Sequence, residues 1–389
     1  MDGAKFAKML SDKHLFELDR MEYKYSVSSV NEFTELLRQN FAQSLPLVDF
    51  SSDELFYLPN LARISTNGMK QLLSAPASNQ SFGLQAMTEE IHATFQIESI
   101  HSSRNSIRHI LNGYAPRNEE ESRIYGMKRG LDFIADRQNT ITEENLHQLY
   151  QISTGDYLPD EDRLLPDHFY RHDVVYVVDG EESREGLPAQ QLPDAMKRLV
   201  DFANAKDGIN ELHKAAILHF VFAYYHPYFD GNGRTARLLH LWYLVQQGYP
   251  AALFTPFSRY IAESKAAYYK AYDRVEKNAL ISGYTDVTPF LSYFCNEVYN
   301  RLQVDAAPPQ ADLQVYQTAL AEGKITEKER LLWEYVLSAY GTEEFTTKQL
   351  EKDFRNAAYA TIRTFVMKFH EMELLVARKT GNRVFYKVK

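Results

Sequence analysis

The stretch His226-Pro-Tyr-Phe-Asp-Gly-Asn-Gly-Arg-Thr-Ala-Arg237 decides how the chain folds, because it joins two helix-forming segments through a glycine-rich turn. Residues 209–225, which precede it, are largely apolar and predict a helix that ends where the proline begins, since proline disfavours helical geometry in the preceding residue. Residues 235–247, which follow it, predict a second helix that Gly248 and Pro250 stop. We therefore expect a tight link between two helices.

The turn has the composition of an anion-binding site. Gly231 and Gly233 permit backbone conformations closed to other residues, so successive N–H groups can converge on an anion at the N-terminus of the second helix. Arg234 and Arg237 lie three residues apart on one face of that helix, at the positive end of its dipole, where cations are mildly unfavourable. An anionic ligand would remove this conflict. The pattern indicates an oxyanion cradle.

Two further side chains of the stretch add chemistry to the cradle. Asp230 directly precedes the turn and can serve as a single-carboxylate ligand for a magnesium ion that also holds substrate phosphates. His226 can accept a proton near neutral pH. The alternative is a capped helix junction with solvated arginines and a core histidine, which would explain any one of these residues alone. Together they favour an enzyme that handles a polyphosphate.

At every polar position the stretch resembles the signature of the Fic family, His-x-Phe-x-Asp/Glu-Gly-Asn-Gly-Arg-x-x-Arg. It departs at Tyr228, where the family usually has Phe, and a hydroxyl packed in the core needs a hydrogen-bond partner. Fic proteins are mostly helical, and most characterised members transfer AMP from ATP to a hydroxyl of a target protein. The resemblance therefore implies a mainly α protein with this activity.

The resemblance also implies a role for each polar residue. It implies that His226 deprotonates the target hydroxyl and that Asp230 holds Mg²⁺. It implies that the backbone amides of the turn and the Asn side chain bind phosphate oxygens. The two guanidinium groups would neutralise the remaining phosphate charge. These phosphate-binding residues are Gly231, Asn232, Gly233, Arg234 and Arg237.

Composition limits the class of protein. A net charge of -9 over 389 residues argues against a protein that coats nucleic acid or anionic membrane along its whole surface. The one cysteine, Cys295, lies in an apolar setting and reads as a small core residue rather than a disulfide or zinc ligand. The N-terminus lacks an apolar signal region, and no apolar run approaches the ~18 residues of a membrane span. We expect a cytoplasmic protein with no membrane contact.

The chain divides into three parts. Residues 305–311 contain paired prolines, which interrupt helix and stiffen a linker. We expect an N-terminal helical region with an inhibitory helix at 1–115, a Fic catalytic core with a small β-hairpin flap at 116–304, and a further domain at 312–389.

The last part reads as three helices and a hairpin. Residues 327–339 and 346–354 predict two helices, and a third follows from apolar residues that recur with helical period: Ile362, Phe365, Phe369 and Met372. Residues 374–379 and 383–389 then flank Thr380-Gly381-Asn382, a hairpin signal. The order resembles a winged helix, the helix-turn-helix variant whose third helix enters the major groove of DNA.

The charge of this part agrees with DNA as a partner. Residues 341–389 hold ten Lys and Arg against six Asp and Glu, a balance of +4 on an otherwise acidic protein. The candidate DNA contacts are Arg363, Lys368, Arg378, Lys379 and Arg383. A protein-docking or dimerisation module with a solvated basic face explains the same residues, and both alternatives stay open.

Residues 84–99, upstream of the motif, are a candidate regulatory segment. An apolar stripe runs along residues 84–95 with helical spacing, and Glu98 follows on the same face, where a carboxylate needs a cationic partner. Residues 94–99 resemble the inhibitory helix of Fic proteins, Ser/Thr-x-x-x-Glu-Gly/Asn. The resemblance implies that Glu98, with Thr94 at the first position, pairs with Arg237 and obstructs productive ATP binding. Ser99 departs from the pattern, and a solvated Glu98 is the alternative.

Two more segments are candidate parts of the site. Residues 171–178 predict a strand where Fic proteins carry a flap hairpin, and an edge strand can hold an extended stretch of the target. Its candidate docking residues are Val174, Val175, Tyr176 and Val177. Tyr268 and Tyr269 lie on a tyrosine-rich segment that, by the resemblance, helps form the nucleotide pocket. A structural hairpin that covers the core is compatible with the same strand residues, and helix packing alone explains at least some of the tyrosines.

The sequence thus predicts a protein adenylyltransferase that uses ATP and Mg²⁺, is autoinhibited by Glu98, and modifies a Ser, Thr or Tyr hydroxyl of a target protein or of itself. One alternative is another use of the same site, either transfer of a different phosphate-linked group or removal of AMP. The other is a DNA-binding regulator whose Fic part only senses nucleotide. The intact His226 argues against the last, since sensing needs no base.

Overall fold

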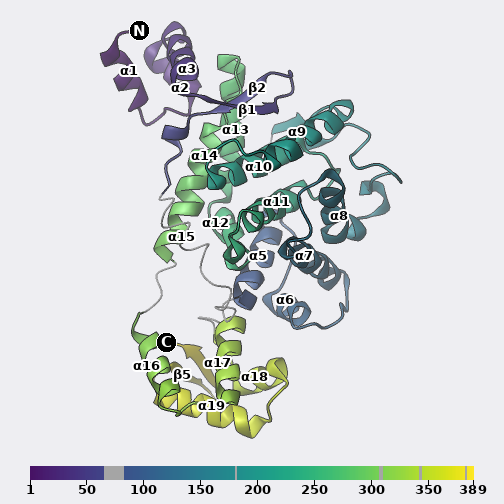
Figure 1. Ribbon diagram of the computed structural model, residues 1–389, viewed down its shortest axis with the longest axis vertical. Coiled ribbons are helices and arrows are strands. Elements are labelled where there is room, and N and C mark those ends of the chain that lie inside the picture. Colours follow the sequence, from purple (N-terminus) through teal and green to yellow (C-terminus); the bar gives the residue numbers. More distant parts are fainter. Residues whose placement is uncertain (65–82, 180–181, 306–309, 341–343, 382) are drawn as a thin grey trace.

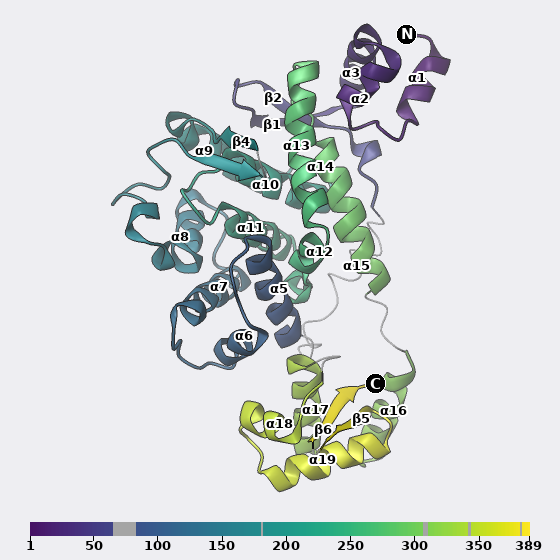
Figure 2. The same ribbon diagram turned by 180° about the vertical axis from the view of Figure 1, so that it is seen from behind.

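The computed structural model describes residues 1–64, 83–179, 182–305, 310–340, 344–381 and 383–389. Helices dominate these residues, and the strands form three separate two-stranded sheets. Both views show an elongated molecule with the N-terminal helices at one end and the C-terminal unit at the other (Figures 1 and 2). The expected mainly helical fold is confirmed.

The N-terminal end has a small core of its own. Its elements are α1 (Gly3–Leu10), α2 (Leu18–Tyr25), α3 (Val27–Phe41), β1 (Gln43–Val48) and β2 (Glu54–Tyr57). Met21, Val30 and Phe33 are fully buried between its helices. The antiparallel β1–β2 hairpin, which the sequence analysis did not predict, adds Leu45 and Leu55 to the larger central core instead.

The central part holds one large hydrophobic core. Its helices are α5 (Gly83–Ile97), α6 (Arg104–Leu111), α7 (Glu119–Ala135), α8 (Glu143–Ser153), α9 (Leu192–Asn204), α10 (Glu211–Tyr225), α11 (Asn232–Gln246), α12 (Phe257–Glu263), α13 (Lys265–Ser282), α14 (Thr288–Tyr293) and α15 (Asn300–Asp305). Its strands are β3 (Tyr176–Asp179) and β4 (Glu182–Glu185). Helices α5 and α6, which the sequence analysis assigned to the N-terminal region, bury Ile91 and Ile107 in this same core.

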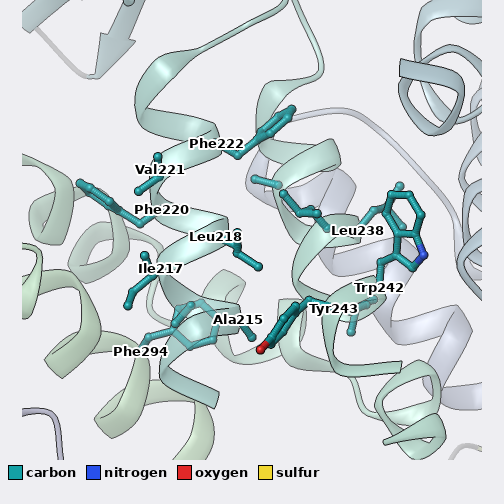
Figure 3. Packing of buried hydrophobic residues seen from close by; sticks show 14 of the residues in the cluster. Ala215, Ile217, Leu218, Phe220, Val221, Phe222, Leu238, Trp242, Tyr243 and Phe294 are labelled. Carbon is teal, nitrogen blue, oxygen red and sulfur yellow. The ribbon is translucent and has the colours of Figure 1, made fainter. Parts of the chain in front are cut away.

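Helices α10 and α11 form the centre of that core. Leu218 and Phe222 of α10 point toward α11, whereas Trp242 of α11 points away from α10 (Figure 3) and its ring packs against Phe133 of α7. Because both helices are apolar on almost every face, they are buried by neighbours on all sides. Cys295 is buried in the adjoining π-helical segment Phe294–Tyr299, as its apolar setting predicted.

The C-terminal unit contains α16 (Gln310–Ala321), α17 (Glu327–Ala339), α18 (Thr347–Phe354), α19 (Tyr359–Glu371), β5 (Leu375–Thr380) and β6 (Arg383–Val388). This is the expected order of three helices and a hairpin, preceded by one further helix. Thr326 and Thr346 cap α17 and α18 through their hydroxyl groups. The predicted linker at 306–309 and the hairpin residue Asn382 lie outside the described residues. Whether this unit acts as a winged helix stays a prediction.

The C-terminal unit rests on the part of the central core that includes α5 and α6. The hydroxyl of Tyr335 in α17 donates to Asn112 Oδ1 at 3.3 Å, and the Arg355 guanidinium lies over the Tyr114 ring at 3.2 Å from its centroid. Leu84, the first residue of the predicted stripe on α5, packs against the C-terminal core, whereas Phe95 belongs to the central one. One helix therefore contributes side chains to both cores, and α5 lies next to α17 in both views (Figures 1 and 2).

No helix among the described residues is long and apolar enough to cross a membrane.

Candidate active site

The predicted junction forms between α10 and α11. His226 is the C-cap of α10 and adopts a left-handed conformation (φ 56°, ψ 60°), which turns the chain sharply into Pro227. Gly231 is the N-cap of α11 and has φ 85°, and a Cβ there would also overlap with Thr154. The second helix begins at Asn232, three residues before its expected start. The glycine-rich turn is thus shorter than the sequence predicts, because its last residues form the first turn of α11.

The His226 imidazole is held as a neutral base. Its Nδ1 lies 3.3 Å from the carbonyl oxygen of Ala223, an arrangement in which Nδ1–H donates and Nε2 keeps its lone pair. Burial, reinforced by the guanidinium groups of Arg184 and Arg171, lowers the pKa of His226 to about 4, while the Ala223 carbonyl and the Glu98 carboxylate act in the opposite direction. The ring is therefore unprotonated at neutral pH and able to accept a proton.

Arg171 belongs to this site, although the sequence analysis did not select it as a candidate. Its side chain is 2% exposed, and its Nε donates to the His226 carbonyl oxygen at 2.8 Å. Its other two nitrogens donate to the carbonyl oxygens of Asp173 and Leu187, at the two ends of the flap. The local sequence carries no signal for this burial, because arginine is rarely buried and the contacts of Arg171 lie mostly in distant segments.

The predicted anion cradle falls at the N-terminus of α11. No side chain caps it, so its first N–H groups lack the acceptors that a capping residue would supply. Arg234 and Arg237 are both buried beside it, and their Nε and Nη1 atoms, respectively, have no hydrogen-bond partner among the described residues. Buried guanidinium nitrogens without acceptors are costly. An anion with several oxygens at this position would satisfy both arginines and the backbone.

Asp230 lies at the mouth of the cradle. Its carboxylate is 49% exposed, accepts from the Gly231 N–H at 2.5 Å, and pairs with Arg234 Nη2 at 2.9 Å. No cluster of three or more His, Cys, Asp or Glu side chains suited to a metal occurs in the described part of the chain. A single accessible carboxylate beside an anion site fits a magnesium ion that takes its other ligands from phosphates and water.

Asn232 and Tyr228 shape the turn from inside. The Asn232 side chain accepts from the Tyr228 N–H at 2.9 Å and donates to the Tyr228 carbonyl at 2.8 Å. Both polar groups of the Asn232 amide are therefore bonded to the backbone of Tyr228. The Tyr228 ring stacks on Tyr150 with centroids 3.5 Å apart. The hydrogen-bond partner expected for the Tyr228 hydroxyl is absent among the described residues, so that expectation was wrong.

The upstream helix α5 reaches the cradle as the resemblance implied. Arg237 donates from Nε to Thr94 Oγ1 and from Nη2 to Glu98 Oε1, both at 2.5 Å. The Glu98 carboxylate is 27% exposed and lies so close to Gly233 that a Cβ on that glycine would overlap with Oε1. A carboxylate oxygen therefore lies at the N-terminus of α11, against the backbone of the cradle.

Neighbouring contacts fix this end of α5. The buried Glu90 carboxylate accepts from the Ser258 N–H at 2.8 Å and from its hydroxyl, which ties α5 to α12. Ser99 has φ 57°, and its hydroxyl accepts from Lys265 Nζ at 3.1 Å. This explains why Gly or Asn suits the position after the glutamate, since both tolerate the left-handed conformation better than Ser.

The two candidate tyrosines of α13 lie beside this contact. Tyr268 is buried, and its hydroxyl bonds to His219 Nε2 at 2.9 Å and to the Tyr272 hydroxyl at 3.2 Å, which makes it part of a buried polar chain. Tyr269 is half-buried, and its hydroxyl donates to the carbonyl of Ile97 at 3.5 Å. Tyr269 thus contacts the end of α5, and a nucleotide-binding role for either ring stays a prediction.

The predicted flap is a hairpin. Strands β3 and β4 pair antiparallel with Val177 opposite Arg184, and within the described residues no third strand joins them. The strand begins at Tyr176, five residues later than the expected strand, although the Val175 carbonyl still accepts from Gly186 N–H. Val174 and Tyr176 are 53% and 62% exposed. An outer edge and exposed side chains are what a target segment would need.

The candidate DNA contacts fall into two groups. Lys368 bonds to both Glu329 oxygens at 2.8 and 2.7 Å, and Arg378 pairs with Glu344. Their charges are thus already balanced inside the C-terminal unit, which makes them poorer candidates than the sequence indicated. The remaining three lie on α19 and the hairpin and are exposed: Arg363, Lys379 and Arg383.

Comparison with known proteins points to one family. The sequence model of the Fic/DOC family matches residues 140–244, from the loop before α8 to near the end of α11. Protein adenylyltransferase fic-1 of Caenorhabditis elegans is 30% identical over 102 residues, which are 26% of this chain and 18% of that protein. Protein adenylyltransferase Fic of Nematostella vectensis is 28% identical over 141 residues, 34% of this chain and 31% of that protein. The matches thus span less than a third of either relative.

Among solved structures, a Fic family protein from Desulfovibrio desulfuricans has a similar fold, with a TM-score of 0.52 and 17% sequence identity over 85% of this chain and 95% of that one. The family match covers the β3–β4 hairpin, the junction between α10 and α11, and most of α11. The chain therefore contains a Fic/DOC family domain.

Proposed function

We propose that this chain is a protein adenylyltransferase, which transfers AMP from ATP to a Ser, Thr or Tyr hydroxyl of a target protein, and that Glu98 inhibits it. One observation carries the proposal: the Glu98 carboxylate pairs with the buried Arg237 at 2.5 Å, 139 residues away in sequence, at the open N-terminus of α11. A carboxylate in the place where phosphate oxygens would bind is what this form of autoinhibition requires.

The residues around the cradle support a direct transfer. The target hydroxyl oxygen attacks the α-phosphorus of ATP, its proton passes to His226 Nε2, and diphosphate leaves. The neutral imidazole is ready for this proton, and the two buried arginines neutralise charge that grows on the phosphate oxygens. A magnesium ion bound by Asp230 and the phosphates would supply further charge neutralisation.

The flap supports a protein substrate. An extended target segment that pairs with the outer edge of the flap would present a side chain to His226 with little demand on its sequence, because the ladder bonds are made by the backbone. Val174, Val175, Tyr176 and Val177 are the proposed docking residues. A segment of this chain itself would fit equally, so self-modification belongs to the proposal, as does a cytoplasmic location.

The experiment that tests the proposal is incubation of the purified chain with magnesium and each of ATP, GTP, CTP and UTP, labelled at the α-phosphate. Label that enters protein from ATP supports it. Label from another nucleotide only, or release of AMP from a modified protein without any labelling, would support the alternative uses of the same site. No labelling by the wild-type chain or by Glu98→Gly would refute the enzymatic proposal.

A second activity, DNA binding by the C-terminal unit, is favoured by the exposed cations of α19 and the hairpin. Arg363, Lys379 and Arg383 would contact phosphates or base edges. The alternative is protein docking through the same basic surface. Binding of a mixed-sequence duplex that weakens steeply with salt would support DNA, whereas no binding at low salt would favour docking and leave the enzyme proposal unchanged.

A further inference from the structure

The last carbonyl groups of α10 and the carbonyl of His226 accept hydrogen bonds from residues around the flap. Helix ends leave carbonyl groups without intrahelical donors. Here the Tyr224 carbonyl accepts from Arg184 Nη1 at 3.2 Å and the Tyr225 carbonyl accepts from the Leu187 N–H at 3.2 Å. The His226 carbonyl accepts from Arg171 Nε at 2.8 Å. Three consecutive carbonyls before the catalytic turn are thus held by donors from residues 171–187.

Arg171 bonds to backbone carbonyls on both sides of the flap and in the turn after α10. Beyond His226, its Nη1 donates to the Asp173 carbonyl at 2.6 Å and its Nη2 donates to the Leu187 carbonyl, while its backbone N–H donates to Pro227 at 2.9 Å. No ion pair of Arg171 occurs in the described part of the chain, so its charge is offset by carbonyl dipoles at a helix C-terminus. A buried arginine with this geometry fixes three backbone segments at once.

We propose that Arg171 is a positioning residue that ties both ends of the flap to His226, so that a target segment on the flap and the catalytic imidazole keep one fixed relative position. The inference rests on the proposed function and deepens it, because it states what aligns the acceptor hydroxyl with the base. Arg171 touches neither substrate nor nucleotide in this account. It acts through the backbone.

A second contact shows that the flap and the base residue are in direct apposition. A Cβ on Gly186 would lie 2.8 Å from Arg171 Nη2, 2.9 Å from Val175 Cγ1 and 3.3 Å from His226 Cβ. The first two distances are shorter than real Cβ contacts, so a methyl group there would have to move its neighbours. Gly186→Ala therefore offers a second way to disturb the contact of the flap with Arg171 and His226 without removing the guanidinium group.

The charge of Arg171 affects the pKa of His226, which can be measured through the pH dependence of the rate. Burial is the main cause of the low pKa of His226; Arg184 and Arg171 lower it further, while the Ala223 carbonyl and Glu98 raise it. Removing the Arg171 charge therefore raises the pKa of His226 from about 4 toward its ordinary value of 6.5. Because the base must be unprotonated, the acid limb of the rate profile moves to higher pH.

The test uses the full chain in the Glu98→Gly background, with MgATP labelled at the α-phosphate, and compares Arg171→Lys, Arg171→Gln and Gly186→Ala. We expect each to lower the initial rate of protein labelling by ~10²-fold at saturating MgATP, as misplacement by about 1 Å does. The dissociation constant for MgATP should stay within about twofold. In Arg171→Gln the acid limb should also rise by a fraction of a pH unit or more.

Arg163→Lys is the matched control, since Arg163 also precedes the flap and donates to a backbone carbonyl, that of Leu158 at 2.9 Å, but is largely exposed. It should label at the parent rate. Parent-like labelling by Arg171→Lys, or an equal loss in MgATP binding, would overturn the inference. If Arg171→Lys lowers the melting temperature markedly, Gly186→Ala decides, and normal labelling by it would overturn the inference too. Failure of the Glu98→Gly parent itself would instead refute the proposed function.

Discussion

Replacement of Glu98 by Gly should raise the transferase activity above that of the wild-type chain. The substitution removes the carboxylate that accepts from Arg237 Nη2 at 2.5 Å and that lies against Gly233. Glu98 follows Ile97, the last residue of α5, so glycine at this position interrupts no helix. The perturbation therefore acts on the cradle rather than on the fold.

The expected size follows from the contact that is lost. A hydrogen bond between charged groups contributes roughly 1.5 to 3 kcal/mol. At ~1.4 kcal/mol per decade, that corresponds to about a ten- to hundredfold change in the occupancy of a productive triphosphate pose. Arg237 keeps its contacts to Thr94, so the guanidinium stays in place while one of its nitrogens becomes available to phosphate.

The assay is the initial rate of protein labelling at saturating MgATP, with Glu89→Gln as the matched control. Glu89 also lies on α5 and pairs with Arg104 at 2.7 Å, so its loss perturbs the same helix without touching the cradle. Arg237→Ala added to Glu98→Gly should abolish the gain. If Glu98→Gly is folded and no more active than the wild type, the inhibitory role is wrong and Glu98 is a structural residue.

Three further outcomes are expected. His226→Ala should lower transfer by ~10²–10⁴-fold with MgATP binding and melting temperature almost unchanged, because a base acts on the acceptor hydroxyl; wild-type transfer would remove His226 from the mechanism. Ser99→Asn should lower basal labelling severalfold, because Asn adopts the φ of 57° at a cost about 1 kcal/mol smaller than Ser does and so stabilises the contact of Glu98 with Arg237. Unchanged labelling would show that the turn at residue 99 does not control this contact. Arg363→Ala or Arg383→Ala should weaken duplex binding at low salt, measured by fluorescence anisotropy, and no binding by the wild type would favour protein docking.

The junction between α10 and α11 could be predicted because the backbone preferences of a few neighbouring residues determine it. Pro227 and Gly231 fix the end of one helix and the start of the next through their own backbone preferences, and the structure shows both. The start of α11 was placed three residues late, because Asn232 and Gly233 disfavour helix interiors but are tolerated in the first turn.

The contacts that tie distant segments together could not be predicted from local pattern. Arg171 contacts a carbonyl 55 residues away, and nothing in its own segment indicates that it is buried. Lys368 adds to the positive charge counted from the sequence, but it forms an ion pair with Glu329, 39 residues earlier, which neutralises that charge. Leu84 belongs to the apolar stripe of α5 but packs into a different core from the rest, which follows from the placement of the C-terminal unit.

The central claim is that the chain transfers AMP from ATP to a protein hydroxyl, with His226 as the base that accepts the proton of that hydroxyl. The most direct measurement compares Glu98→Gly incubated with magnesium and ATP labelled at the α-phosphate or at the γ-phosphate, with Glu98→Gly/His226→Ala beside it. The account predicts that label enters protein from the α-position only, with a protein mass increase equal to that of AMP less one water, and that the double variant labels ~10²-fold less or not at all. Label from the γ-position, or equal labelling by the double variant, would contradict it.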